Sequence, residues 1–196
     1  MLLSTAYFPP VAWFALAARG PFLLEACENY QKQSYRNRCY ILSSDGAQML
    51  QVPVVHGASW AIRDVLVDYS TPWVLRTQRA LDTAYETSAF YEYYRDEVFA
   101  LLDAKPATLW ELNLSTIRWA FGALGVPCRL DETIDFVAES PEDYRFTLHP
   151  KKAAVLPEKP YYQVFRDRLE CFTPGLSVMD LIFNEGPGAI SFVISK

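Results

Sequence analysis

The sequence contains few histidines and cysteines, and this limits the metal and redox chemistry open to it. Of its 196 residues, two are histidine and four are cysteine. The histidines are His56 and His149, and the cysteines are Cys27, Cys39, Cys128 and Cys171. The cysteines are widely spaced and form no Cys-x-x-Cys pair, so they are expected to be buried free thiols. No metal site is predicted, because a centre with several histidine ligands is excluded.

Long apolar runs are also absent. No stretch reaches the roughly 18 uninterrupted apolar residues that cross a bilayer, so no membrane span is predicted. The apolar N-terminus lacks the positive charge that begins an export signal, and Pro9-Pro10 interrupts it where the signal helix would run. We therefore expect this segment to form the first strand and the first helix of the fold.

Two common catalytic motifs and a positive charge excess are missing as well. The sequence contains neither a glycine-rich phosphate loop nor a Gly-x-Ser-x-Gly elbow. Its formal net charge is −5, which disfavours nucleic acid as a partner.

The apolar content that is present predicts a folded globule. Hydrophobic residues make up 51% of the chain and aromatic residues 15%, and this length favours a single domain over residues 1–196. The chain opens with a strand in Met1–Tyr7, a helix in Val11–Ala18 and a strand in Phe22–Cys27. A strand–helix–strand order of this kind favours a parallel pair in an α/β fold.

The next segments indicate antiparallel pairing. Apolar residues at Cys39–Leu42 and Met49–Val55 flank the turn-forming segment Ser43–Gly46, which is typical of a hairpin. Ile62–Val67 is expected to continue the sheet. The sheet is therefore predicted to be mixed.

From Trp73 the apolar period changes to that of helices. Helices are predicted to begin near Trp73, at Ser88 as an N-cap, and at Thr108, where Glu111 completes a capping box. A last helix is expected over Ser177–Glu185, with Ser177 and Asp180 as capping residues. The predicted class is thus α/β, with a mixed, partly parallel sheet, a central block of three helices and a C-terminal helix.

One polar stretch, Glu28–Arg38, has the composition of a ligand-binding surface. It contains long donor side chains in place of the Gly, Pro and Asp that are common in turns, and it has no aliphatic residue. Its cations could hold a phosphate or carboxylate, its amides could orient hydroxyls, and its tyrosines could stack on a ring. The alternative is a solvated connection whose arginines pair with acids. Together with the turn after the first strand, the candidate ligand-binding residues are Tyr7, Asn29, Tyr30, Lys32, Tyr35, Arg36, Asn37 and Arg38.

These segments carry a resemblance to a known family. The stretch Tyr7-Phe8-Pro9-Pro10-Val11-Ala12-Trp13-Phe14, the polar stretch Glu28–Cys39, Asp68-Tyr69-Ser70-Thr71-Pro72-Trp73 and Leu176–Pro187 resemble the WbqC-like protein family in order along the chain. The resemblance implies a cytoplasmic bacterial protein of surface-polysaccharide (O-antigen) biosynthesis. It also implies a transferase that moves an acyl or aminoacyl group to an amino sugar or a nucleotide sugar. No cofactor and no oligomeric state are implied.

The sequence departs from the family where relatives carry histidine. Many relatives have His-Gln-Pro where this chain has Ser4-Thr5-Ala6. Relatives often carry a histidine at the position of Thr77, and some carry one at the position of Cys27. A carboxylate would have to replace the missing imidazole as general base, and Glu28 and Asp68 are the candidates. The alternative is a non-catalytic ligand-binding or assembly protein that uses the same cleft.

Overall fold

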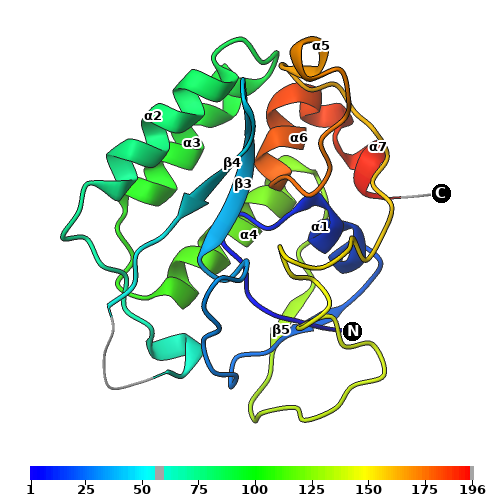
Figure 1. Ribbon diagram of the computed structural model, residues 1–196. Helices are drawn as coiled ribbons and strands as arrows, with labels where there is room; N and C mark the ends of the chain where they lie inside the picture. The colour runs from blue at the N-terminus through cyan, green and yellow to red at the C-terminus, as the bar shows by residue number, and fades with distance from the viewer. Residues whose placement is uncertain (56–59, 195–196) are drawn as a thin grey trace.

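Strands form two small sheets with helices packed around them (Figure 1). The computed structural model describes residues 1–55 and 60–194; His56 lies outside this range. The first sheet contains β1 (Leu2–Leu3), β2 (Phe22–Leu24) and β5 (Leu130–Glu132), all parallel and in that order. Helix α1 (Val11–Ala17) connects β1 to β2. The predicted parallel pair at the start of the chain is therefore confirmed.

The second sheet is a hairpin of β3 (Arg38–Ser43) and β4 (Gly46–Gln51). Ser43 and Gly46 are its last paired residues, and Gly46 has a φ of +110°. A side chain is strained at such a φ, so glycine suits this turn. The other edge of β3 meets the chain near α6, where the Ser177 N–H donates to the Tyr40 carbonyl at 2.7 Å. The mixed α/β class is confirmed, with parallel and antiparallel strands in separate sheets.

The central helical block is also confirmed. It consists of α2 (Trp73–Tyr85), α3 (Tyr91–Asp103) and α4 (Leu109–Ala123). Thr108 accepts from the Glu111 N–H while the Glu111 carboxylate accepts from the Thr108 N–H, which is the expected capping box. Aromatic rings of α1 and β2 pack on α4, with Phe14 and Phe22 5.1 and 5.9 Å from the Phe121 ring. This packing fixes the parallel sheet against the helices.

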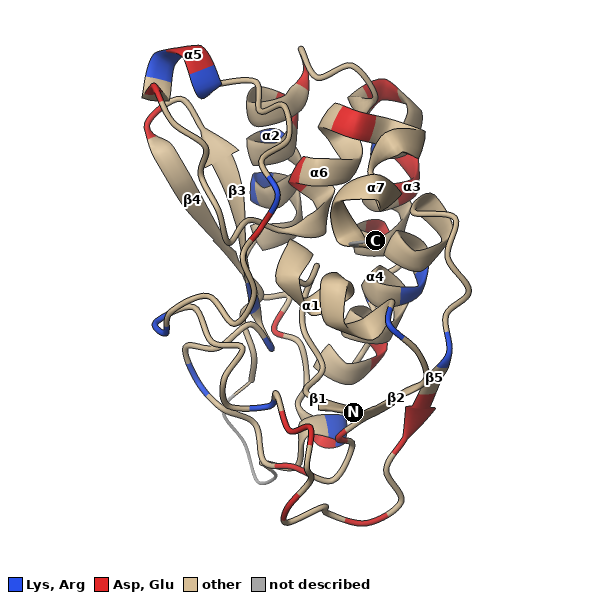
Figure 2. Ribbon diagram, turned by 90° about the vertical axis from the view of Figure 1, so that its right-hand side faces the viewer, with Lys and Arg blue, Asp and Glu red and all other residues tan. Residues whose placement is uncertain are grey.

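The C-terminal region contains α5 (Arg166–Leu169), α6 (Val178–Glu185), η2 (Gly186–Gly188) and α7 (Ile190–Val193). Ser177 caps α6, as predicted, by accepting from the Met179 N–H. Among the described residues, no helix is both long and apolar enough to cross a membrane. The loop after β5 carries several acidic residues (Figure 2).

Some local predictions were wrong. Ile62–Val67 is not a strand: η1 (Ile62–Asp64) begins it, and only isolated bridges at Leu66 and Val67 follow. The Ile62 N–H donates to the Glu28 carbonyl, and residues 65–67 share only single backbone hydrogen bonds with Val55, Ala107 and Leu109, so no continuous ladder forms. Phe90, not Ser88, occupies the N-cap of α3.

Two further predictions were wrong because they misjudged which side chains are buried. Only Cys39 is buried, whereas the other cysteines are exposed. Asp180 does not cap α6; its side chain is buried and bonds to Tyr85 and Tyr161 instead. Tertiary packing decides both outcomes.

Candidate functional site

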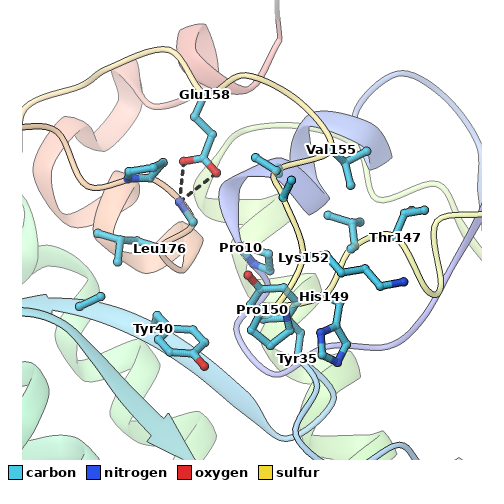
Figure 3. A pocket seen from close by; sticks show the side chains of 17 residues that line it. Pro10, Tyr35, Tyr40, Thr147, His149, Pro150, Lys152, Val155, Glu158 and Leu176 are labelled. Atoms are coloured by element: carbon cyan, nitrogen blue, oxygen red, sulfur yellow. Dashed lines mark hydrogen bonds between the residues drawn. The ribbon is translucent and has the colours of Figure 1, made fainter.

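A cleft of about 340 Å³ lies between the β3–β4 hairpin and the irregular segment 147–158 that passes over it (Figure 3). Tyr35 and Tyr40 line it from the hairpin side. His149, Lys152 and Glu158 line it from the overlying segment. Pockets of this size accommodate small-molecule ligands.

The aromatic side of the cleft is held by backbone hydrogen bonds. The Tyr35 carbonyl accepts from the Tyr7 N–H at 2.9 Å, and the Tyr40 carbonyl accepts from the Ser177 N–H. The rings of Tyr35 and Tyr40 meet edge to face, 6.3 Å apart at 85°. Burial, with the nearby Tyr40 and Glu158, raises the pKa of Tyr35 to about 12. The backbone positions of both tyrosines are therefore fixed, and the phenol of Tyr35 is a neutral hydrogen-bond donor at physiological pH.

Glu158 supplies a carboxyl group with a perturbed pKa. Both of its oxygens accept from the Gly175 N–H at 3.1 Å, as the dashed lines in Figure 3 mark. Burial raises the pKa of Glu158, with a further contribution from Asp180, and the Gly175 N–H opposes the rise. A raised pKa makes a carboxylate a stronger base, which suits it to accept a proton in a reaction.

His149 supplies an imidazole that is neutral at physiological pH. Burial lowers its pKa, and the neighbouring cations Lys152, Lys151 and Arg36 lower it further. Its Nδ1 accepts from the Lys151 N–H at 3.1 Å. In the neutral ring this bond assigns the proton to Nε2, so His149 is a hydrogen-bond donor through Nε2.

The residue after Tyr35, Arg36, forms a buried ion pair. The Arg36 guanidinium donates to both oxygens of Glu28, at 2.8 and 2.5 Å, and to the Ser4 hydroxyl at 2.7 Å. Arg36 and Glu28 are each 3% exposed or less. Their bidentate pair holds the backbone next to Tyr35. Arg36 thus pairs with an acid, as the alternative interpretation of the polar stretch expected, but the pair is buried and not solvated.

The next two residues of the predicted set lie at the start of the β3–β4 hairpin. Asn37 is buried, and its Nδ2 donates to the Val52 carbonyl at 2.9 Å. Arg38 begins β3 opposite Gln51, and its Nε is closed off from solvent without a hydrogen-bond partner. Neither residue lines the cleft.

Tyr30 and Lys32 belong to a separate surface. The rings of Tyr30 and Trp60 stack at 6.5 Å and 10°, and the Lys32 Nζ lies 5.1 Å from the centre of the Trp60 ring. Asn29 is exposed and forms an isolated bridge with Ala61. The structure therefore brings these residues together with Trp60 and not with the cleft.

Neither Tyr7 nor Asp68 lines the cleft. Tyr7 is wholly buried, and burial raises the pKa of its phenol well above the ordinary value. Asp68 precedes α2, accepts from the Ser70 N–H at 2.8 Å and has a pKa lowered by Ser70. Of the predicted ligand-binding set, only Tyr35 lines the cleft itself.

The sequence interpretation missed the cleft residues Tyr40, His149, Lys152 and Glu158. The last three lie in a charged, proline-bearing segment, a composition that predicts a solvated loop. No local pattern marks this segment as the cover of a cleft. Within the described part of the chain, no group of three His, Cys, Asp or Glu residues is arranged to hold a metal ion.

Comparison with known proteins gives a family but no activity. The model of the WbqC-like protein family matches residues 5–149. Over 98% of the chain, the sequence is 25% identical to an uncharacterized protein, Rv1507c, from Mycobacterium tuberculosis, of which 96% is covered. No solved structure matches the chain.

Proposed function

The chain belongs to the WbqC-like protein family, and on that premise we propose that the cleft binds a nucleotide-activated amino sugar and catalyses acyl or aminoacyl transfer to it. The observation that carries the proposal is the chemistry of the lining: two tyrosines, a lysine, a neutral imidazole donor and a carboxyl group with a raised pKa. The place in bacterial surface-polysaccharide biosynthesis, in the cytoplasm, follows from the family resemblance and is part of the proposal.

Each cleft residue has a role in this reaction. Lys152 holds a phosphate oxygen, and the faces of Tyr35 and Tyr40 pack on the sugar or base. The sugar amine attacks the acyl carbonyl, so a C–N bond forms while the bond to the leaving group breaks. Glu158 takes the proton that the amine loses, and the His149 Nε2–H donates to the carbonyl oxygen as negative charge develops there.

The earlier candidate bases take other roles in this proposal. Both Glu28 oxygens are bound by Arg36, so Glu28 positions the backbone of Tyr35 and does not accept the amine proton. Asp68 accepts from Ser70 and does not line the cleft. Glu158 is therefore the proposed carboxylate base.

Ligand binding is tested by thermal unfolding with a uridine diphosphate amino sugar. At a ligand concentration of about 100 Kd, binding stabilises the protein by roughly 2.7 kcal/mol, which raises the Tm by about 5–10 °C. Lys152→Ala is expected to weaken binding roughly tenfold, because a charge-assisted bond to phosphate is lost. Lys151→Ala is the matched control, since the Lys151 Nζ donates to Gln33 outside the cleft. Equal effects of the two substitutions would contradict the proposed site.

Catalysis is tested separately with Glu158→Gln, which keeps the shape and the acceptor for the Gly175 N–H. The rate of transfer to the sugar amine is expected to fall by about 10²–10⁴ while sugar binding persists. Binding in the wild-type protein with no turnover of any acyl or aminoacyl donor would favour the alternative, a ligand-binding or assembly protein. Turnover that survives Glu158→Gln would remove this residue as the base.

A further inference from the structure

A groove of about 320 Å³ lies between β4 and the first turns of α2. Strand β4 contributes residues 48–51 to it, and α2 contributes Trp73, Arg76 and Thr77. It has no lining residue in common with the cleft of the proposed function. A ligand that binds in this groove would therefore be independent of the proposed transferase site.

One of the residues that line the groove, Trp73, carries a buried donor without an acceptor. Trp73 is 4% exposed, and its indole Nε1 is closed off from solvent and has no hydrogen-bond partner. A buried N–H that has lost its water and found no acceptor destabilises the fold. Such a group at a groove points to an acceptor that arrives with a ligand.

The polar lining consists of donors, with no carboxylate. None of the lining residues is acidic, and Arg76 is exposed and has no ion-pair partner among the described residues. The amides of Gln48 and Gln51 can donate as well. Asp68, the nearest carboxylate before α2, is outside the lining and accepts from Ser70.

The helix adds to this preference for negative charge. Trp73 is the first residue of α2, which is 13 residues long, and the groove opens beside that end. The N-terminus of a helix carries a partial positive charge that favours anions. An acceptor bearing negative charge would thus meet the helix end, the indole N–H and Arg76 together.

The rest of the lining is aliphatic. Met49, Leu50, Pro53 and Ala80 supply apolar surface, and Met49 is 43% exposed. The Trp73 Nε1 is closed off from solvent, so a ligand reaches it only when a lining side chain shifts, and methionine is unbranched and adaptable enough to do so. We propose that this groove binds a small carboxylate with an aliphatic body, with the carboxylate at Trp73 and Arg76 and the chain along Met49 and Leu50.

The test is a titration of the ¹⁵N-labelled protein with hexanoate, followed through the indole N–H signals. The chain has five tryptophans, so five such signals are expected, and Trp73→Phe identifies the one from Trp73. Hexanoate should shift the Trp73 signal in a saturable way, whereas 1-hexanol, which lacks the anion, should not. Inorganic phosphate is an anion without an aliphatic chain. It should bind more weakly than hexanoate if the apolar part of the groove contributes, whereas equal binding would indicate a general anion site.

Two variants complete the test. Arg76→Gln is expected to weaken hexanoate binding roughly tenfold, because the charge-assisted bond is lost. Arg79→Gln, on the same helix but outside the lining, should leave the affinity unchanged. An unmoved Trp73 signal, equal binding of 1-hexanol, or equal weakening by both arginine variants would overturn the proposal.

Discussion

Replacing Arg145 by methionine should lower the free energy of unfolding by about 3–5 kcal/mol, because it leaves a buried carboxylate without its counter-charge. The side chains of Arg145 and Glu25 are both 0% exposed, and the Arg145 Nη1 donates to Glu25 at 2.9 Å. The Nη2 donates to Asp143 at 2.6 Å. Equilibrium unfolding in urea at neutral pH measures the change.

The matched control for Arg145 is Arg129→Met, since Arg129 is exposed and the change there should stay within about 0.5 kcal/mol. The double variant Glu25→Gln with Arg145→Met should lose less than the sum of the single changes, because no unpaired charge stays buried. A loss below about 1 kcal/mol for Arg145→Met would show that the pair does not hold the fold.

The Arg145 ion pairs lie at the point where the chain after β5 returns to the parallel sheet. The Leu2 N–H donates to the Glu142 carbonyl at 2.8 Å, and the Tyr144 N–H donates to the Leu2 carbonyl at 3.0 Å. The segment that covers the cleft begins shortly after Arg145. Loss of the pair should therefore lower both the stability of the fold and the affinity of the cleft for its ligand.

Replacing Asp180 by asparagine should change how stability depends on pH. Asp180 is 0% exposed and accepts from the hydroxyls of Tyr85 and Tyr161, each at 2.7 Å. The Gln163 Nε2 donates to it at 3.3 Å, and no cation is paired with it among the described residues. Burial raises the pKa of Asp180 to about 6 from 3.8, and the three hydrogen bonds oppose the rise.

The direction of the effect follows from that shift. The folded state binds the proton more tightly than the unfolded state, so the contribution of Asp180 to stability is fully present below pH 3.8 and is lost as the pH rises to about 6. The loss amounts to about 3 kcal/mol. An asparagine amide can accept from one tyrosine hydroxyl and donate to the other, so the variant keeps the contacts without the charge.

Unfolding of both proteins at several pH values provides the measurement. The free energy of unfolding of Asp180→Asn relative to wild type should rise by about 3 kcal/mol between pH 3 and pH 7 and then level off. The difference between the proteins is used, because Glu158 also has a raised pKa and titrates in both. A difference that is constant with pH would mean that Asp180 is ionised throughout at little cost.

Local sequence was sufficient for most of the secondary structure. The capping box at Thr108 and Glu111 begins α4, and Ser177 begins α6, because capping depends on residues within one turn of the helix. The turn ending at Gly46 closes the hairpin for a similarly local reason. Ile62–Val67 has strand-like composition, but a strand needs a neighbour along its whole length, and the chain offers it only isolated bridges.

The candidate site depends on contacts between distant parts of the chain. Composition identified Glu28–Arg38 as unusual, and Tyr35 within it does line the cleft. The burial of Arg36 against Glu28 depends on Ser4 and on the chain near Arg145, which no local pattern reveals. His149, Lys152 and Glu158 become cleft residues only because their segment lies over the hairpin.

By itself the sequence determined the longer helices, the hairpin turn, the α/β class and the resemblance to a family, since these depend on periodicity, capping and motifs along the chain. Only the tertiary structure decided which polar side chains are buried and paired and which line a cleft. The physical reason is that the cost of burying a charge, and so its pKa and its availability to a ligand, is set by neighbours more than a hundred residues away, as with Glu25 and Arg145.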